Sequence, residues 1–253
     1  MDARVIQVVK DHPHPLLFAT VSGAHLYGFA SDDSDVDIRG VHLLPCEAVL
    51  GLDQPEETIS RIWDQDGLEL DLVTHDAAKF FGMMLGRNGY VLEQLFSPLV
   101  LHGGQVHEEL KTLGRRCITR HHARHYLGFA ANQWKLFLKE KEQRAKPILY
   151  VFRVLFTGIH LMRTGEMEMN LATLNGDFGE PLLDELIAIK RGGAEKETID
   201  AGFLERLQTL KDRYEAELEK AYEQSALPEA NTCRPDLNNL LLRLRRNHWR
   251  EEG

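Results

Sequence analysis

The chain has 253 residues, 43% of them hydrophobic, and a formal net charge of −9. This composition predicts a packed hydrophobic core and excludes a wholly disordered chain. The cysteines, Cys46, Cys117 and Cys233, are widely spaced and match neither a disulfide framework nor a zinc motif. We therefore expect a reducing, cytoplasmic location.

No membrane segment is expected. The N-terminal residues carry charges among their apolar positions and lack the apolar core of a signal peptide. The most apolar long stretch, residues 148–162, is interrupted by Arg153 and His160. It is too short and too polar to be expected to span a bilayer.

Charge is distributed unevenly along the chain. Residues 1–105 contain 6 basic and 16 acidic residues, a net charge of −10. Residues 106–164 contain 12 basic and 4 acidic residues, net +8, and residues 165–253 contain 12 and 19, net −7. Such blocks have two explanations. They are either solvated surface charge or a site in which a cation-dependent part meets an anion-binding part.

The first part of the chain predicts a small α/β unit. Apolar runs and alternation predict strands at residues 16–21, 36–44 and 68–74, with a turn at 22–28. Apolar residues at helical spacing predict helices at residues 76–85 and 90–96.

After Gly103 and Gly104 the pattern becomes helical. The helices predicted here span residues 105–113, 120–140, 147–163, 182–191, 197–224 and 235–247. We therefore predict an α+β fold with two domains, residues 1–104 and 105–253, the second entirely helical.

Paired aspartates follow a glycine-containing turn. On a strand, residues two apart point to the same face, so Asp35 and Asp37 should project together. Two such carboxylates repel each other unless a cation lies between them, and Mg²⁺ prefers oxygen ligands. The next predicted strand offers Glu69 and Asp71 as a third carboxylate. A surface turn is the alternative explanation for aspartates in this spacing.

A family resemblance strengthens the catalytic interpretation. The motifs that carry it are GAHLYG at 23–28, SDVDIRG at 34–40, NGYVLEQLF at 88–96, YLGFA at 126–130, KPILYVFR at 146–153 and TGEM at 164–167. The chain resembles the DNA polymerase β-like nucleotidyltransferases, and most closely their RNA-repair-associated branch. The resemblance covers most of the chain and implies a small mixed sheet with flanking helices, followed by an all-helical domain that completes the site.

The resemblance implies a role for each matching residue. Asp35, Asp37 and Asp71 would be catalytic and would bind Mg²⁺ or Mn²⁺, as two ions, with Glu69 the competitor of Asp71. The remaining residues implied to bind the nucleoside triphosphate are Ser22, Gly23, Ala24, His25, Ser34, Lys146, Tyr150 and Arg153. The backbone N–H groups after Gly23 would contact its phosphates.

One position departs from the family pattern. The family usually has serine after the first glycine, where this chain has Ala24. Alanine keeps the backbone donor but removes one hydroxyl hydrogen bond, of order 1–3 kcal/mol when the acceptor is charged. We expect weaker nucleotide binding with the chemistry retained.

The basic block suggests an RNA partner. The arginines proposed to contact RNA phosphates are Arg115, Arg116, Arg120 and Arg124. They lie close in sequence to His121, His122 and His125, whose spacing is a weak indication of a metal site. A solvated helix with structural ion pairs is the alternative.

The sequence thus predicts a metal-dependent nucleotidyltransferase that moves a nucleoside monophosphate to an RNA 3′-hydroxyl. A protein or small-molecule hydroxyl is the second choice of acceptor. A non-catalytic nucleotide- or RNA-binding module is the third hypothesis, which Ala24 keeps open.

Overall fold

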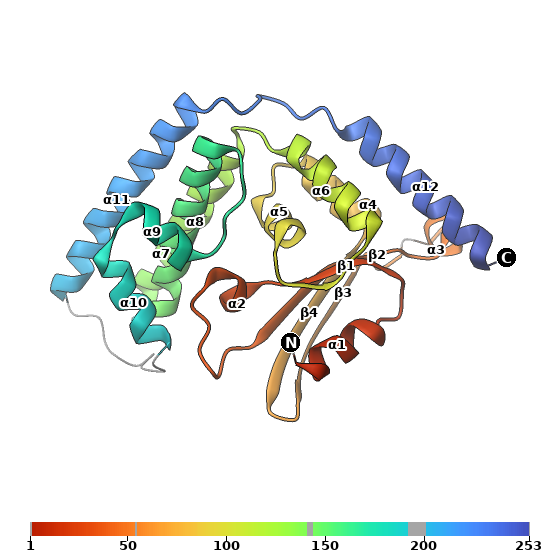
Figure 1. Ribbon diagram of the computed structural model, residues 1–253, viewed down its shortest axis with the longest axis horizontal. Helices are drawn as coiled ribbons and strands as arrows, with labels where there is room; N and C mark the ends of the chain where they lie inside the picture. Colours follow the sequence, from red (N-terminus) through yellow and green to blue (C-terminus); the bar gives the residue numbers. More distant parts are fainter. Residues whose placement is uncertain (1, 54, 141–143, 192–200, 253) are drawn as a thin grey trace. The chain divides into compact units, whose positions relative to one another are not determined.

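The computed structural model describes residues 2–53, 55–140, 144–191 and 201–252 (Figure 1). The chain divides into two units, the first made of residues 1–23, 35–118 and 230–253, the second of 24–34 and 119–229. This division differs from the predicted boundary at residue 104. The helix after that boundary and the C-terminal helix group with the sheet, and the segment 24–34 groups with the helices.

The first unit is built on a five-stranded mixed sheet with the order β3-β4-β2-β1-β5. Its strands are β1 (Leu16–Val21), β2 (Val36–His42), β3 (Thr58–Gln65), β4 (Leu68–Asp76) and β5 (Val100–His102). Only β2 and β4 pair in parallel; the other described pairs are antiparallel. The predicted α+β class is confirmed.

Strand alternation places one hydrophobic cluster on one face of this sheet. Val36 and Ile38 of β2 are buried with Leu70 and Leu72 of β4, their cross-strand partners. Val5 of the N-terminal helix joins the same cluster. The residues between these positions, Asp37 among them, therefore point to the opposite face.

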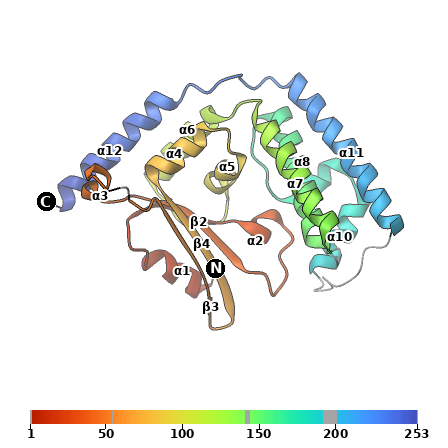
Figure 2. The same cartoon turned by 180° about the vertical axis from the view of Figure 1, so that it is seen from behind.

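The sequence analysis did not predict the β3–β4 hairpin, which projects beyond the other strands in both views (Figures 1 and 2). β3 is an edge strand with mostly exposed side chains, so its apolar signal is weak. The turn did carry a signal: Asp66 and Gly67 have φ of 54° and 77°. An Asp-Gly pair between strands is typical of a tight hairpin.

Six helices accompany the sheet in the described part of the first unit. They are α1 (Ala3–Lys10), α3 (Cys46–Leu50), α4 (Ala77–Leu85), α5 (Gly89–Phe96), α6 (Gln105–Cys117) and α12 (Arg234–Glu252). The short helices α1 and α3 were not predicted.

A buried ion pair holds α12 on the sheet. Arg245 donates to both carboxylate oxygens of Asp76, at 2.7 and 2.6 Å. The Asp76 side chain is 2% exposed and that of Arg245 is 12% exposed. Asp76 also caps α4 by accepting from the Ala78 N–H. Contacts between residues this far apart in sequence explain why the C-terminal helix belongs to the first unit.

The second unit is helical, with α7 (His122–Lys139), α8 (Ala145–Thr164), α9 (Leu171–Phe178), α10 (Pro181–Arg191) and α11 (Ala201–Gln224). The short helix α2 (Gly23–Tyr27) occupies the predicted turn, and all of its residues except Gly23 belong to this unit. α8 is long and apolar enough to cross a membrane by composition, but 78% of that window is buried in the structure, which is typical of a core helix.

Segment 24–34 is anchored on the helices of its own unit. Arg191 of α10 donates to the Gly28 carbonyl, and Lys190 donates to Ser31 Oγ at 2.8 Å. Gly28 has φ +83°, and a Cβ there would lie 2.2 Å from Asn170 Oδ1. Only glycine fits this contact without displacing Asn170.

A buried histidine on β2 predicts a pH dependence of stability. His42 is completely buried, and its Nδ1 lies 2.9 Å from Thr74 Oγ1. Burial, followed by the charge of His12, lowers the pKa of His42 from 6.5 to about 4. Between these values the unfolded chain binds a proton that the folded chain does not, so stability falls as pH falls. Below pH 4 this contribution is fully lost.

We expect the free energy of unfolding to drop by roughly 2 kcal/mol between pH 7 and pH 5 from this group. Urea unfolding at both pH values measures it. His42→Asn keeps a donor to Thr74 but does not titrate, so its stability should depend less on pH. An equal drop in that variant would contradict the assignment to His42.

Candidate active site

The two predicted metal-binding strands bring Asp37 and Asp71 together. β2 and β4 pair in parallel with Asp37 directly opposite Asp71. Both carboxylates lie on the sheet face opposite the cluster of Val36, Ile38, Leu70 and Leu72 and are 15% and 21% exposed. Asp35 lies two residues before Asp37, just ahead of β2, and is partly exposed. Asp35 precedes the first residue of β2, so its place on the face of Asp37 stays a prediction from the alternation.

Arg39 lies between these carboxylates and was missed as a site residue. Its Nη2 donates to Asp37 Oδ1 at 2.5 Å and to Asp71 Oδ2 at 2.7 Å. Nη1 donates to the Asp71 carbonyl at 2.7 Å, and Nε donates to Tyr90 Oη of α5 at 2.9 Å. The spacing could have revealed it, since Arg39 follows Asp37 by two residues and therefore shares its face.

The register distinguishes Asp71 from Glu69. Glu69 is exposed and lies opposite Asp64 of the edge strand, two residues before Asp71. Of the two, Asp71 is the residue that lies opposite Asp37, and both aspartates form an ion pair with Arg39. The geometry therefore favours Asp71 as the third carboxylate.

The glycine turn lies against the carboxylate of Asp37. Gly23 has φ +62°, and a Cβ at this position would lie 1.7 Å from Asp37 Oδ2. The buried Ser22 donates its backbone N–H to the Asp37 carbonyl at 2.8 Å. Asp37 thus directs one oxygen to Arg39 and the other to the turn. Glycine is required by both the positive φ and this close approach.

The other residues of this segment have different surroundings. Ala24 is buried at 2% exposure, and His25 is exposed. Ser34 Oγ accepts from the Ser31 N–H at 3.0 Å and so closes the turn before Asp35. Ser34 therefore has a structural role in this conformation.

The three residues predicted on α8 lie in the second unit. The Arg153 guanidinium carbon lies 3.9 Å from the Tyr27 ring centroid, and Arg153 is 2% exposed. Tyr150 packs edge-on against Tyr27 and Phe29, with ring centroids 5.5 Å apart in each pair. Lys146 is partly exposed. Arg153 and Tyr150 thus pack against aromatic residues of the GAHLYGFA segment, and Lys146, like Tyr150, is partly exposed.

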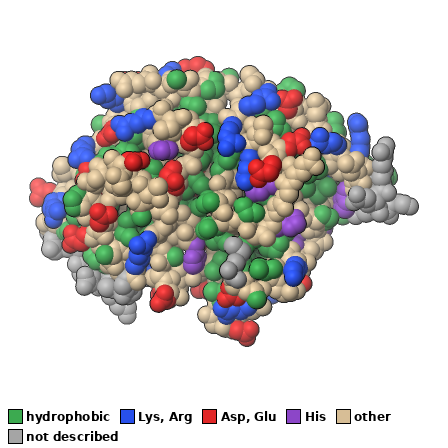
Figure 3. All heavy atoms as spheres, viewed as in Figure 1, with side chains coloured by type: hydrophobic (Ala, Val, Ile, Leu, Met, Phe, Trp, Pro, Cys, Tyr) green, Lys and Arg blue, Asp and Glu red, His purple; other side chains and the backbone are tan. Residues whose placement is uncertain are grey.

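The predicted RNA-contacting arginines are divided between the units. Arg116 pairs with Asp236 at 2.6 Å, and Arg115 lies 5.5 Å from the Phe96 ring centroid, both in the first unit. In the second unit, Arg124 lies 4.7 Å from a tyrosine ring of α11. On the face seen in Figure 3, basic and acidic side chains are interspersed.

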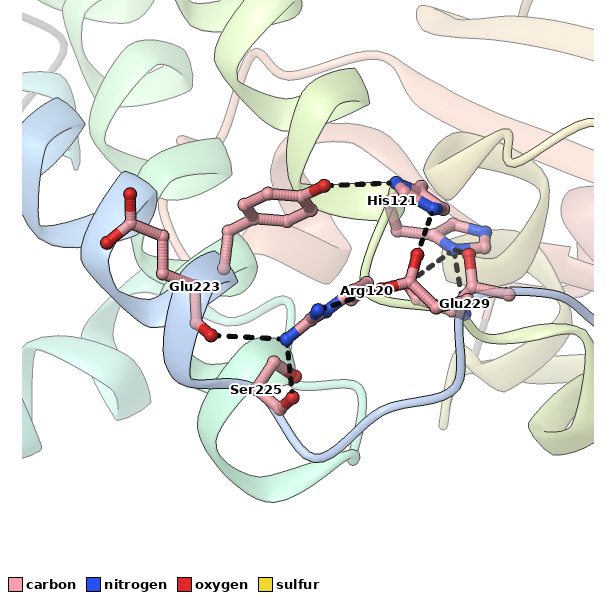
Figure 4. A network of polar contacts seen from close by, with 8 residues as sticks. Arg120, His121, Glu223, Ser225 and Glu229 are labelled. Atoms are coloured by element: carbon pink, nitrogen blue, oxygen red, sulfur yellow. Dashed lines mark hydrogen bonds and ion pairs between the residues drawn. The ribbon is translucent and has the colours of Figure 1, made fainter.

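Arg120 is engaged in a network of its own (Figure 4). It donates to Glu229 Oε1 at 2.8 Å and to the carbonyls of Glu223 and Ser225, at 3.2 and 2.9 Å. These carbonyls end α11, so Arg120 satisfies acceptors that the helix leaves unpaired. In this structure the Arg120 guanidinium therefore donates its hydrogen bonds to a carboxylate and two carbonyls of the protein.

The donor set fits a hard divalent cation. Asp37 and Asp71 supply carboxylate oxygens on one sheet face, and the absence of a Cβ at Gly23 allows Asp37 Oδ2 to lie against the glycine turn. Among the residues described, no three His, Cys, Asp or Glu side chains form a ready-made metal cluster. Arg39 supplies the positive charge between two of the carboxylates in this conformation.

Comparisons with known proteins identify the family of the chain. The RNA repair pathway DNA polymerase beta family matches residues 1–243. The uncharacterized protein MJ0002 of Methanocaldococcus jannaschii is 28% identical over 217 residues, covering 83% of this chain and 86% of its own. The uncharacterized protein YcgL of Bacillus subtilis is 26% identical over 271 residues, covering 100% of both chains.

A solved structure gives a weaker likeness. The crystal structure of a nucleotidyltransferase-like protein from Exiguobacterium sibiricum is 13% identical and has a TM-score of 0.33. The match covers 98% of this chain and 75% of that one. The family match, by contrast, includes the glycine turn and all three aspartates. The chain therefore belongs to the RNA repair pathway DNA polymerase beta family and is a nucleotidyltransferase.

Proposed function

We propose that this enzyme transfers a nucleoside monophosphate from a nucleoside triphosphate to an RNA 3′-hydroxyl, with Mg²⁺ or Mn²⁺ bound. The observation that carries the proposal is the placement of Asp37 opposite Asp71, with Gly23 against the Asp37 carboxylate. The RNA acceptor is supported by the description of the family and by the net charge of +8 in residues 106–164. We also propose a cytoplasmic location.

The proposed site residues of the first unit have different roles. Asp35, Asp37 and Asp71 would hold the cations, which supply charge neutralisation at the phosphates and activation of the acceptor hydroxyl. The backbone donors of the glycine turn bind phosphate oxygens. Arg39 holds the facing carboxylates of Asp37 and Asp71 at a fixed separation. This prepared geometry lowers the reorganisation that phosphoryl transfer requires.

Lys146 is our proposed phosphate-binding residue on α8. It is partly exposed and carries a positive charge, whereas Arg153 is buried. The hydrogen bond from Ser31 is the main reason that the pKa of Asp33 is lowered, with smaller contributions from the charges of Lys190 and Lys146. Arg115 and Arg124 are the proposed RNA contacts, because each lies over an aromatic ring and has no carboxylate partner among the described residues. Arg116 and Arg120 are paired with carboxylates instead.

A labelling assay tests the proposal. The protein is incubated with Mg²⁺ or Mn²⁺, each α-labelled nucleoside triphosphate in turn, and an RNA oligonucleotide with a free 3′-hydroxyl. Lengthened, labelled RNA is the expected product and reveals the base preference. Label on protein would instead favour a protein hydroxyl as acceptor. Nucleotide binding without any transfer would support a non-catalytic module.

Ala24→Ser is expected to tighten nucleotide binding. The added hydroxyl can donate one hydrogen bond to a charged phosphate oxygen, worth roughly 1–3 kcal/mol, so we expect the triphosphate Kd to fall by about tenfold. Titration by calorimetry measures it, with Ala30→Ser in the same segment as a control. Ala24 is 2% exposed, so an unchanged Kd in a folded variant would show that this side chain does not face the phosphates.

A further inference from the structure

A tyrosine, a histidine and a glutamate of the second unit form a hydrogen-bonded chain (Figure 4). Tyr222 Oη of α11 lies 3.3 Å from His121 Nδ1. On the other side of the imidazole, His121 Nε2 lies 2.8 Å from Glu229 Oε2. The His121 side chain is 21% exposed and that of Glu229 is 67% exposed, so solutes reach this chain of groups.

The two contacts of His121 define its tautomer. A carboxylate only accepts hydrogen bonds, so the neutral imidazole places its proton on Nε2 toward Glu229. Nδ1 then carries the lone pair and accepts the hydrogen of the Tyr222 hydroxyl. This is the order of groups in which a carboxylate orients a histidine and the histidine removes a proton from a nucleophile.

Charged side chains surround these three groups. The hydrogen bond from Arg120 is the main reason that the pKa of Glu229 lies below its usual range, so Glu229 stays ionised at neutral pH. The guanidinium carbons of Arg120 and Arg124 lie 5.4 and 4.7 Å from the Tyr222 ring centroid. Nearby cations attract a phosphate-bearing reagent.

A helix-capping role does not account for the whole arrangement. Arg120 alone reaches the carbonyls at the end of α11. His121 contacts neither of them in its described hydrogen bonds and lies instead between Tyr222 and Glu229. By contrast, Tyr214 on the same helix is buried and donates directly to Glu180, which together with burial raises its pKa.

We propose that Tyr222 is a nucleophile that accepts a nucleotidyl group. The Tyr222 oxygen attacks the α-phosphorus of a nucleoside triphosphate, the bond to the β-phosphate oxygen breaks, and pyrophosphate leaves. The phenolic proton passes to His121 Nδ1, and the product is an O-nucleotidyl tyrosine. The donor rests on the proposed nucleotidyltransferase function; the nucleophile rests on the contacts of Tyr222 itself.

The first experiment asks where protein-bound label is located. The full chain is incubated with each α-labelled nucleoside triphosphate and Mg²⁺ without RNA, digested, and mapped by mass spectrometry. We expect label on the Tyr222 peptide, none on the Tyr214 peptide, and loss of the label in Tyr222→Phe. RNA extension in the parallel assay without any label on Tyr222 would overturn this proposal and leave the proposed function standing.

A second set of variants tests the proposed proton transfer from Tyr222 to His121, which we call the relay. His121→Asn keeps an acceptor near the Tyr222 hydroxyl but is not basic, and we expect labelling to slow by about 100-fold. Glu223→Gln is the matched control, because its carboxylate points away from His121 and only its backbone carbonyl contacts Arg120 (Figure 4). Equal labelling rates in His121→Asn and the wild type would refute the relay. Thermal unfolding of each variant verifies that it is folded.

A chemical probe tests the reactivity of Tyr222 independently of the proposed nucleotide-binding site. Adenosine 5′-phosphorimidazolide carries its own leaving group, so it is applied to the Asp37→Ala chain, in which the proposed donor site is disabled. We expect it to modify Tyr222 about 100-fold faster than the same chain carrying His121→Asn. If the wild type transfers nothing from triphosphates but the probe selects Tyr222, the proposed function fails and the nucleophile stands. Equal rates with and without His121 would overturn the nucleophile.

Discussion

Asp37→Ala is expected to abolish nucleotidyl transfer while the protein remains folded. Asp37 directs one carboxylate oxygen to Arg39 and the other to the glycine turn, so its removal takes away the group that links the turn to Asp71. Loss of metal-assisted charge neutralisation at the phosphates should lower kcat/KM by at least about 1,000-fold. RNA extension with labelled triphosphate measures the effect.

Asp32→Ala is the matched control for this prediction. Asp32 belongs to the same run of aspartates but is exposed and precedes the strand. We expect the activity of Asp32→Ala to remain within a few-fold of that of the wild type. If both variants kept the activity of the wild type, Asp37 would not belong to the metal site. If both variants lost activity to the same extent, the loss would reflect a general effect of charge in this segment.

Arg39→Met is expected to make the stability of the protein depend on divalent cations. In the wild type the Arg39 guanidinium offsets the facing carboxylates of Asp37 and Asp71 and is only 8% exposed. Without it two partly buried like charges face each other, which we expect to cost roughly 2 kcal/mol of unfolding free energy. Mn²⁺ should recover much of this loss, because it supplies the missing positive charge between the same oxygens.

Urea unfolding with chelator and with Mn²⁺ measures both parts of this prediction. Arg61→Met is the control, since Arg61 lies on the same sheet over Trp63, 4.6 Å from its ring centroid, and faces neither carboxylate. The destabilisation of Arg39→Met should shrink in Mn²⁺, and that of Arg61→Met should not. The same loss under both conditions would show that Arg39 acts only through packing and its hydrogen bond to Tyr90.

Several elements could be predicted because their signals are local. The apolar run at residues 16–21 predicts a strand with the bounds that β1 has. The alternation of Val36 and Ile38 with Asp35 and Asp37 separates the core face from the carboxylate face, as the structure confirms for the residues of β2. The β3 strand was missed because an edge strand exposes most of its side chains and has little apolar pattern.

The division into units could not be predicted in the same way. α12 joins the sheet through Arg245 and Asp76, which are far apart in sequence. Segment 24–34 joins the helices through Lys190 and Arg191. Neither contact leaves a pattern along the chain, because each depends on a partner that only folding brings near.

By itself, the sequence determined the strand and helix periodicities, the family, and the placement of Asp37 on the face opposite Val36 and Ile38, since all of these follow from neighbouring residues or from matched motifs. Only the tertiary structure decided that Asp71, rather than Glu69, lies opposite Asp37 and that Arg39 bridges them. The reason is physical: the register of two parallel strands depends on packing of their buried faces and on the connection between them, and a shift of one residue would turn every carboxylate to the other side.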